Sequence, residues 1–248
     1  MLPFAGHSFE PLAHFHIVRY VELSVFGIDI SITNAVVWMW VAVVAAFLFF
    51  RLALRNSLVV PGRLQMLAEL CYLFVLRMVE KNIRREGRRF LPIVFTLFFF
   101  VLFCNLVGLL PGGFTPTSQL VVTGSLALAV FLFTIVLRVA RHGWGVFHAF
   151  APSGVPWMLL PLMVPIEIIS FIARPMSLAV RLFANMTAGH TVLAVIAFFG
   201  MGAHWLVAWL PMGFSVAFTG MEIFIAVIQG YIFSILSCVY IDDALEEG

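Results

Sequence analysis

Long stretches of the chain are almost continuously apolar, and their lengths predict helices that cross a membrane. A transmembrane helix needs about 20 mostly apolar residues. Three segments meet this length, at residues 34–54, 90–110 and 118–137. The turn PGGFTPTS joins the second segment to the third and is rich in glycine and proline. We therefore expect residues 90–141 to form a helical hairpin.

Two further apolar segments, residues 156–203 and 206–241, are too long to stand upright in a bilayer. As helices they would measure roughly 70 and 54 Å, whereas the hydrocarbon core is only about 30 Å thick. The sequence therefore predicts a long, tilted helical hairpin over residues 156–241. Its turn is expected near residues 200–206, where glycines and His204 interrupt the apolar run.

The stretch between the first two membrane spans is basic and amphipathic. Residues 64–84 have the period of a helix with one apolar face, which is typical of a helix at a membrane surface. The residues predicted to share that face are Leu67, Leu70, Phe74 and Met78.

Charge predicts how the chain is oriented. Most of the 14 lysines and arginines lie in or beside residues 55–89. The positive-inside rule places this region on the cytoplasmic side. The N-terminal segment, residues 1–33, is then expected outside, and the acidic tail, residues 242–248, inside.

The composition excludes a water-soluble enzyme. Of 248 residues, 63% are hydrophobic and 10% are charged, whereas a soluble domain carries about 25% charged residues. The formal net charge of +2 is too small to indicate nucleic-acid binding. The predicted fold class is an all-α integral membrane protein with about five membrane helices and one interfacial amphipathic helix.

The cysteines and histidines predict neither a metal site nor a cofactor. The cysteines are widely spaced and odd in number, which favours reduced, structural thiols; they are Cys71, Cys104 and Cys238. The N-terminal histidines lack a strong metal-ligand spacing and are expected in a solvated loop; they are His7, His14 and His16. No cleavable signal peptide is expected, because the first residues lack a basic region followed by an apolar run.

Charged residues inside the predicted membrane segments are the functional candidates. Those between Arg141 and Asp242 are Glu167, Arg174, Arg181 and Glu222. A charge inside a bilayer costs about 2.5–3.5 kcal/mol on insertion scales. One polar set falls within an arc of about 80° on an ideal helix: Glu167, Ser170, Arg174, Ser177, Arg181 and Asn185. A second set shares a face of the last segment: Ser215, Thr219, Glu222, Gln229 and Tyr240.

Folding the two long segments about residue 205 predicts which polar groups lie at similar depth. From the turn towards the chain ends, the expected neighbours are His190 with Glu222, Arg181 with Gln229, and Glu167 with Asp243. His190 would point about 180° away from Arg181 around its helix.

Some of these groups also allow a purely structural interpretation. The alternatives are an ion pair of Arg174 with Glu167, a polar pair of His190 with Glu222, and a helix–helix hydrogen bond by Gln229. Arg181 is harder to explain in this way, because its guanidinium stays charged and the nearest acid in its own segment is Glu167.

This layout suits proton translocation. Titratable His and Glu side chains can pass protons between water and the membrane interior. Arg181 cannot release a proton, so it would interrupt a continuous wire and attract a carboxylate. The pattern predicts two half-paths separated by a fixed positive charge, with a mobile carboxylate supplied by another chain.

Three stretches of the chain resemble subunit a of F-type ATP synthases. They are ARPMSLAVRLFANMTAGH, NLVGLLPGGFTPTSQL and MEIFIAVIQGYIFSILSCVYI. The resemblance covers most of the chain from about residue 30 onwards. Arg181 matches the essential arginine of the family's SLxLRLFxN motif, with Val180 in place of the usual leucine.

The resemblance implies roles for the other polar residues. The implied positions are Asn185 and Gln229 beside Arg181, His190 and Glu222 in an outer half-channel, Glu167 in an inner half-channel, and Arg174 before the proline of the motif. Ser177 and Tyr240, on the two polar faces, are further candidates for the proton path.

The resemblance also implies a mechanism and partners. Protons would neutralise carboxylates on a rotating c-ring, and Arg181 would prevent leakage between the half-channels. The implied partners are the c-ring, peripheral-stalk subunit b, the remaining ATP synthase subunits, lipid and protons. The chain has no GxxxxGK[ST] phosphate loop, so it is expected to be non-catalytic. A bacterial inner membrane is the expected location, and a mitochondrial inner membrane is the alternative.

Other functions make different predictions. A stand-alone proton-coupled transporter or ion channel would carry ions without a rotor. A respiratory-complex subunit that binds quinone or haem is another alternative. Haem would need suitably placed intramembrane histidines, and His190 and His204 lie in one hairpin with no clear opposing partner. A structural scaffold would tolerate Arg181→Ala.

Overall fold

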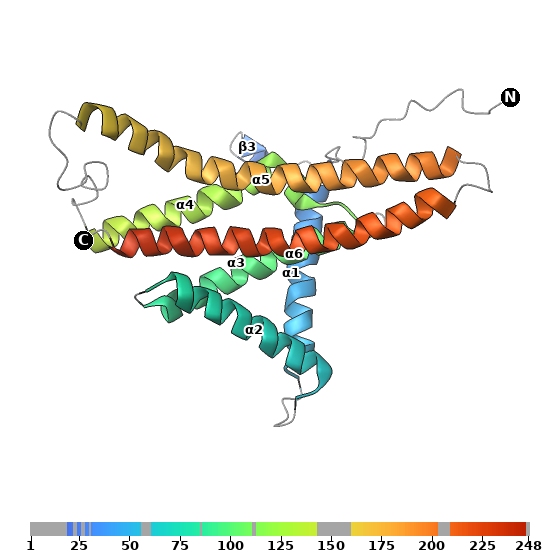
Figure 1. Ribbon diagram of the computed structural model, residues 1–248, viewed down its shortest axis with the longest axis horizontal. Helices are drawn as coiled ribbons and strands as arrows, with labels where there is room; N and C mark the ends of the chain where they lie inside the picture. The colour runs from blue at the N-terminus through green and yellow to red at the C-terminus, as the bar shows by residue number, and fades with distance from the viewer. Residues whose placement is uncertain are drawn as a thin grey trace.

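The computed structural model consists mainly of long helices (Figure 1). It describes residues 19–21, 24–25, 28–29, 31–55, 61–84, 86–110, 113–142, 160–202 and 209–246. The α-helices in these residues are α1 (Asn34–Ala53), α2 (Arg63–Asn82), α3 (Gly87–Gly108), α4 (Leu120–His142), α5 (Leu160–Gly202) and α6 (Trp209–Glu246). All of them except α2 are long and apolar enough to span a membrane. The predicted fold class is therefore confirmed.

Short strands precede α1, and the sequence did not predict them. β1 (Arg19–Val21) pairs antiparallel with β4 (Ile32–Thr33), and β2 (Ser24–Val25) pairs antiparallel with β3 (Ile28–Asp29). Strands of two or three residues are too short to show an alternating pattern. The predicted loop histidines at residues 7, 14 and 16 lie outside the described residues.

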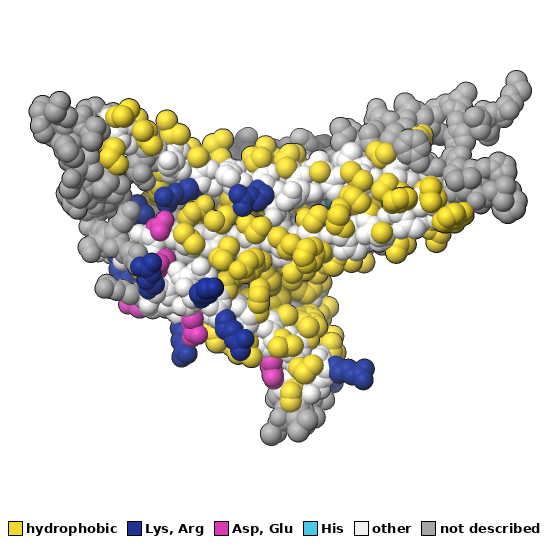
Figure 2. All heavy atoms as spheres, viewed as in Figure 1, with side chains coloured by type: hydrophobic (Ala, Val, Ile, Leu, Met, Phe, Trp, Pro, Cys, Tyr) yellow, Lys and Arg dark blue, Asp and Glu magenta, His cyan; other side chains and the backbone are white. Residues whose placement is uncertain are grey.

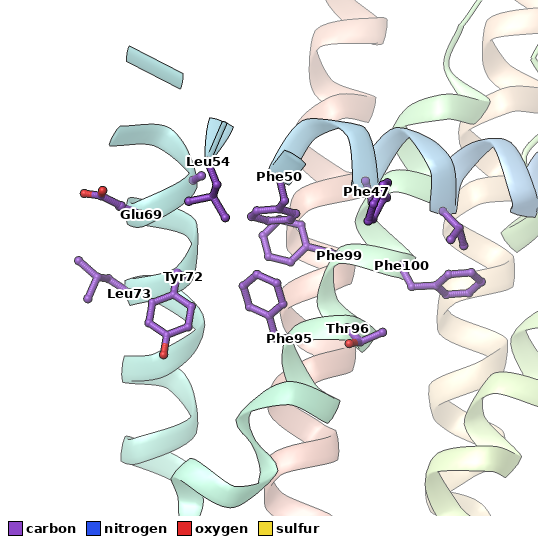
Figure 3. A pocket seen from close by; sticks show the side chains of 13 residues that line it. Phe47, Phe50, Leu54, Glu69, Tyr72, Leu73, Phe95, Thr96, Phe99 and Phe100 are labelled. Atoms are coloured by element: carbon purple, nitrogen blue, oxygen red, sulfur yellow. The ribbon is translucent and has the colours of Figure 1, made fainter. Parts of the chain in front are cut away.

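The phenylalanine-rich helix α3 lies at the centre of the helix assembly and contacts α1, α2 and α6. The ring of Phe99 packs edge-on against Phe50 of α1, with ring centroids 4.7 Å apart. Between α1, α2 and α3 lies a recess of about 790 Å³ (Figure 3). Tyr72 and Phe95 point towards each other there, whereas Glu69 points away. Because lipid is as apolar as these side chains, close packing rather than exclusion of water holds the helices together.

The amphipathic helix α2 uses its apolar residues in two ways. Leu67, Leu70 and Phe74 of the predicted apolar face are exposed, as expected for a helix at a membrane surface. Met78 is only 6% exposed and packs with Val79 in the protein core. Met78 lies on the same side of α2 as these three residues, but it does not face the membrane surface as expected, because the last turns of α2 pack against the neighbouring helices.

Helices α5 and α6 lie side by side as an antiparallel hairpin (Figure 1). The predicted turn falls largely on residues 203–208, which lie outside the described residues. The expected register is not kept along the whole hairpin, because Asp243, expected at the depth of Glu167, pairs with Arg174, which lies two helical turns further along α5. The first part of α5 diverges from α6 in Figure 1, and it contains Pro165 and Pro175. Proline bends helices, so a constant register could not be expected there.

Charged side chains from several helices meet where α6 ends. The pairs are Arg141 with Glu86 at 2.6 Å, Arg89 with Glu86 at 3.6 Å, Arg88 with Glu80 at 2.8 Å, and Arg174 with Asp243 at 3.0 Å. We call this region the charged end. Asp242 also accepts a hydrogen bond from the backbone N–H of Arg84, at 2.9 Å. Residues 242 and 243, expected in a separate tail, therefore belong to α6.

The surface pattern agrees with a membrane location. In Figure 2 the Lys, Arg, Asp and Glu side chains gather at the charged end and along α2. Hydrophobic side chains cover the centre of the same face. An apolar surface bordered by charges is what a bilayer accommodates.

Candidate functional site

A pocket with a mixed polar and apolar lining, called the polar pocket below, lies where α5 and α6 meet the segment that links α3 to α4. The cavity measures about 380 Å³. Its polar lining residues are Thr115, Ser118, His190, Ser215 and Thr219. Such hydroxyl and imidazole groups can hold water, which an apolar lining could not.

His190 connects this pocket to the buried Glu222. Its Nε2 shares a hydrogen bond with Thr115 Oγ1, at 2.5 Å. Its Nδ1 lies 3.7 Å from Glu222 Oε1. The structure therefore brings together the two residues that the sequence placed at the same depth.

Glu222 is enclosed, with a side chain only 1% exposed. Neither of its carboxyl oxygens has a hydrogen-bond partner within the described residues. The 3.7 Å separation from His190 exceeds the usual hydrogen-bond length of about 2.7–3.2 Å. A small movement of His190 or an inserted water can complete the connection, which makes this pair suitable for transferring a proton.

Two glycines make room for these contacts. A Cβ at Gly189 of α5 would lie 2.6 Å from Glu222 Oε1, so only glycine lets the carboxyl group lie against that backbone. A Cβ at Gly108, the last residue of α3, would lie 2.9 Å from the Cα of Thr115. Gly108 therefore lets the linking segment return closely over α3 and present Thr115 to His190.

Buried hydrogen bonds hold the linking segment in this position. Thr117 Oγ1 donates to Asn105 Oδ1 of α3 at 2.6 Å. Ser118 Oγ donates to the Thr115 carbonyl at 2.7 Å. Sequence reasoning treated this segment only as a turn and missed Thr115 and Ser118. Its three hydroxyl residues close to an apolar span were the signal that could have identified them.

Arg181 does not lie on the side of α5 that packs in the core. Leu178 and Leu182 on its helix are 3% and 1% exposed and pack in the core, whereas Arg181 is exposed. Ser177 and Asn185, one helical turn away on either side, are exposed as well. The polar stripe predicted for α5 thus faces outwards around Arg181, while His190 is half-buried on another side.

The structure does not join all the polar residues that the sequence grouped around Arg181. Gln229 of α6 is only 3% exposed. Within the described residues, no hydrogen bond links Arg181 to Gln229 or to Asn185. Their role in positioning Arg181 therefore stays a prediction.

A second polar group lies at the charged end of the hairpin. Arg174 pairs with Asp243 at 3.0 Å and lies over the ring of Tyr240, at 5.9 Å from its centroid. Tyr240 is also within electrostatic reach of Arg181. Glu167 lies in α5, but its side chain is outside the described part of the structure.

Arg138 of α4 belongs to the same neighbourhood and was not among the predicted site residues. It is only 8% exposed, and its guanidinium lies 5.9 Å from the centroid of the Phe171 ring. Together with Arg174 it lines a small cavity of about 20 Å³ beside Tyr240.

Polar groups therefore lie at both ends of the hairpin, with an exposed arginine between them. His190 and Glu222 can exchange a proton at the end near the turn. Arg174, Tyr240 and Asp243 form a polar cluster at the other end. Arg181 lies between these groups along α5 and cannot relay a proton, because its guanidinium stays protonated.

Known proteins are similar in sequence to this chain over almost its whole length. The family described as ATP synthase A chain matches residues 36–242. A protein of Magnetococcus marinus named ATP synthase subunit a is 54% identical over 245 residues, covering 97% of this chain and 95% of the relative. One of Hyphomonas neptunium with the same name is 46% identical over 244 residues, covering 96% of each. With this extent of similarity, the chain belongs to the ATP synthase A chain family.

Proposed function

We propose that this chain is the proton-translocating subunit a of an ATP synthase and works through two half-channels kept apart by Arg181. The observation that carries the proposal is the exposed position of Arg181 between two polar groups. Its exposed neighbours on the same side of α5 carry no charge; they are Ser177, Ala184, Asn185 and Ala188. A lone cation on such a surface favours an anionic partner from another subunit.

The outer half-channel in this proposal is the polar pocket. Thr115, His190 and Glu222 form a series of polar groups from the cavity to the buried carboxyl group, in which the step from His190 to Glu222 is 3.7 Å. A proton entering from water would pass through His190 and Glu222 to a carboxylate on the c-ring. The neutral carboxyl group can then move into lipid, which a charged one resists.

The inner half-channel would lie at the charged end. We assign Glu167, Ser177 and Tyr240 to it, with Arg174 held in place by Asp243. A c-ring carboxyl group arriving there releases its proton, because water and the positive charge of Arg181 favour its ionised form. Asn185 and Gln229 would limit the positions that the Arg181 side chain can occupy.

The fixed charge of Arg181 makes proton flow depend on rotation. A proton that could pass directly between the half-channels would dissipate the gradient, and a guanidinium between them opposes that route. Each charge that crosses 100 mV releases about 2.3 kcal/mol. Several protons must therefore contribute to one ATP, which requires a rotor that accumulates their work.

We also propose the arrangement of the chain in its membrane. The basic charged end and α2 would face the cytoplasm of a bacterium, with the N-terminus outside and the C-terminus inside. The c-ring would contact the exposed face of α5 around Arg181, and subunit b would hold the chain as part of the stator.

The test compares Arg181→Ala with Arg51→Ala, which removes an exposed cation from the end of α1. Both variants are measured in vesicles that contain the assembled complex. We expect Arg181→Ala to abolish ATP-driven acidification and to raise the passive proton leak after the catalytic head is removed. Arg51→Ala should retain pumping.

Normal pumping and a normal leak in assembled Arg181→Ala complexes would overturn the proposal. Reconstitution of the chain alone provides a second test. Proton transport at the full rate without a rotor would instead indicate a stand-alone transporter or channel.

A further inference from the structure

A second pocket, unconnected with the proton path, lies between α2 and α6. Its volume is about 550 Å³, within the range of about 300–1,000 Å³ for small-molecule sites. One part of the lining is basic and polar, with Arg77, Lys81 and Asn82. The other part is apolar, with Leu73, Phe74 and Ile235 among its residues.

The two cations of this pocket have no acidic partner among the described residues. Arg77 and Lys81 are four residues apart on α2, so they project from the same side of the helix. Glu80, the acid next to Lys81, pairs with Arg88 instead. Arg77 and Lys81 differ in this respect from Arg141 and Arg174 at the charged end, which are paired with acids. The pocket therefore combines unneutralised positive charge with apolar walls.

The position of α2 identifies the chemistry of a suitable ligand. α2 is not among the helices able to span the membrane, and Leu67, Leu70 and Phe74 are exposed along it. Such a helix lies near the level of lipid headgroups. Basic pockets between helices at a membrane surface bind the headgroups of anionic lipids.

We propose that this pocket binds an anionic phospholipid. Its phosphate would lie between Arg77 and Lys81, and an acyl chain would run along Phe74 and Ile235. Phe74 already contacts Tyr231 of α6, with ring centroids 5.7 Å apart. The bound lipid would thus fill the space beside this contact and hold α2 against α6.

The first experiment photocrosslinks the wild-type complex with phosphatidylglycerol that carries a photoreactive group on its acyl chain. Phosphatidylcholine with the same group is the neutral control. We expect phosphatidylglycerol to label peptides that contain Phe74 or Ile235, and phosphatidylcholine to label them much less. Equal labelling by both lipids, no labelling of these peptides, or crosslinks there to another subunit would overturn the proposal.

The second experiment compares Arg77→Gln/Lys81→Gln with Arg51→Gln/Arg63→Gln. The control pair removes the same charge from exposed positions of α1 and α2 that do not line this pocket. We expect the affinity for phosphatidylglycerol to fall by roughly tenfold or more in the first variant only, because each cation near the surface attracts anionic lipid. Equal affinities of the two variants for phosphatidylglycerol would contradict the assignment of Arg77 and Lys81 to the lipid site.

Excess inorganic phosphate distinguishes a lipid site from a simple anion site. Because the apolar walls contribute to binding, we expect phosphate not to displace the phospholipid. Displacement by phosphate alone would overturn the proposal that a lipid is the ligand.

Discussion

At the residue scale, the position of Glu222 depends on the absence of a side chain at Gly189. Its carboxyl group is enclosed without a hydrogen bond from a described residue, and it lies against Gly189 where any side chain would intrude. The titratable side chain of His190 lies beside it, with Nδ1 at 3.7 Å from Glu222 Oε1. The geometry thus leaves Glu222 dependent on His190 or on water for its proton.

The first prediction concerns Gly189→Ala. The new Cβ would lie 2.6 Å from Glu222 Oε1, at the flexible end of that side chain. We expect Glu222 to shift rather than the helices to separate, so the complex should assemble but pump protons several-fold more slowly. The initial rate of ATP-driven acidification in vesicles measures this.

A matched control is Gly230→Ala on α6, where the nearest atoms to a new Cβ lie at 3.6 Å, an ordinary contact. This variant should pump at nearly the wild-type rate. Equal rates for both variants would show that the contact between Gly189 and Glu222 does not matter for proton transfer.

At the scale of the elements, the end of α3 determines where the linking segment lies. A Cβ added at Gly108 would meet the backbone of Thr115. Backbone atoms cannot move aside as easily as the end of a flexible side chain. The buried hydrogen bond from Thr117 to Asn105 further restricts the segment. The polar pocket therefore depends on a backbone contact as well as on its polar side chains.

The second prediction is that Gly108→Ala destabilises the protein. Its Cβ would lie 2.9 Å from the Cα of Thr115, and overpacking of this kind costs about 1–3 kcal/mol. We expect a lower unfolding temperature of the purified complex in detergent, together with slower pumping.

Gly124→Ala on α4 is the control for this effect, because no atom lies within 4 Å of the added Cβ. It should leave the unfolding temperature unchanged or raise it slightly, since alanine favours helices more than glycine does. A wild-type unfolding temperature for Gly108→Ala would contradict the prediction.

At the scale of the whole molecule, the exposure of the three cysteines indicates how tightly the helices pack around each of them. Cys104 and Cys238 are fully buried, and Cys71 on α2 is partly exposed. Burial also raises the pKa of the Cys71 thiol. Since the thiolate is the reactive form, Cys71 should react slowly at neutral pH.

The third prediction is that a water-soluble alkylating reagent labels only Cys71 in the folded complex. The rate should rise with pH, because a raised pKa delays formation of the thiolate. Mass spectrometry of digested protein gives the rate for each cysteine. Cys71→Ser should abolish labelling until the chain is unfolded in SDS, and rapid native labelling of Cys104 or Cys238 would disprove the predicted packing.

Much of the helical architecture followed from the order of apolar and polar residues. A bilayer requires long apolar helices, so the five spanning helices, the amphipathic α2 and the long last hairpin were all predictable. The depth of His190 and Glu222 was also predictable, because both residues lie close to the turn of that hairpin.

Contacts between distant segments were not predictable in the same way. The pairing of Arg174 with Asp243 depends on how α5 diverges from α6, and the placement of Thr115 depends on the close approach at Gly108. The burial of Met78 depends on the neighbours of α2. None of these contacts leaves a periodic pattern in the sequence.

The sequence by itself determined the fold class, the membrane location and the exceptional character of Arg181, because the energetic cost of a buried charge depends on residue type and segment length. Only the tertiary structure decided that Arg181 is exposed, that Glu222 lies against Gly189, and that Arg77 and Lys81 border a pocket. These features depend on how helices approach one another, which is set by the fit of side chains from separate parts of the chain.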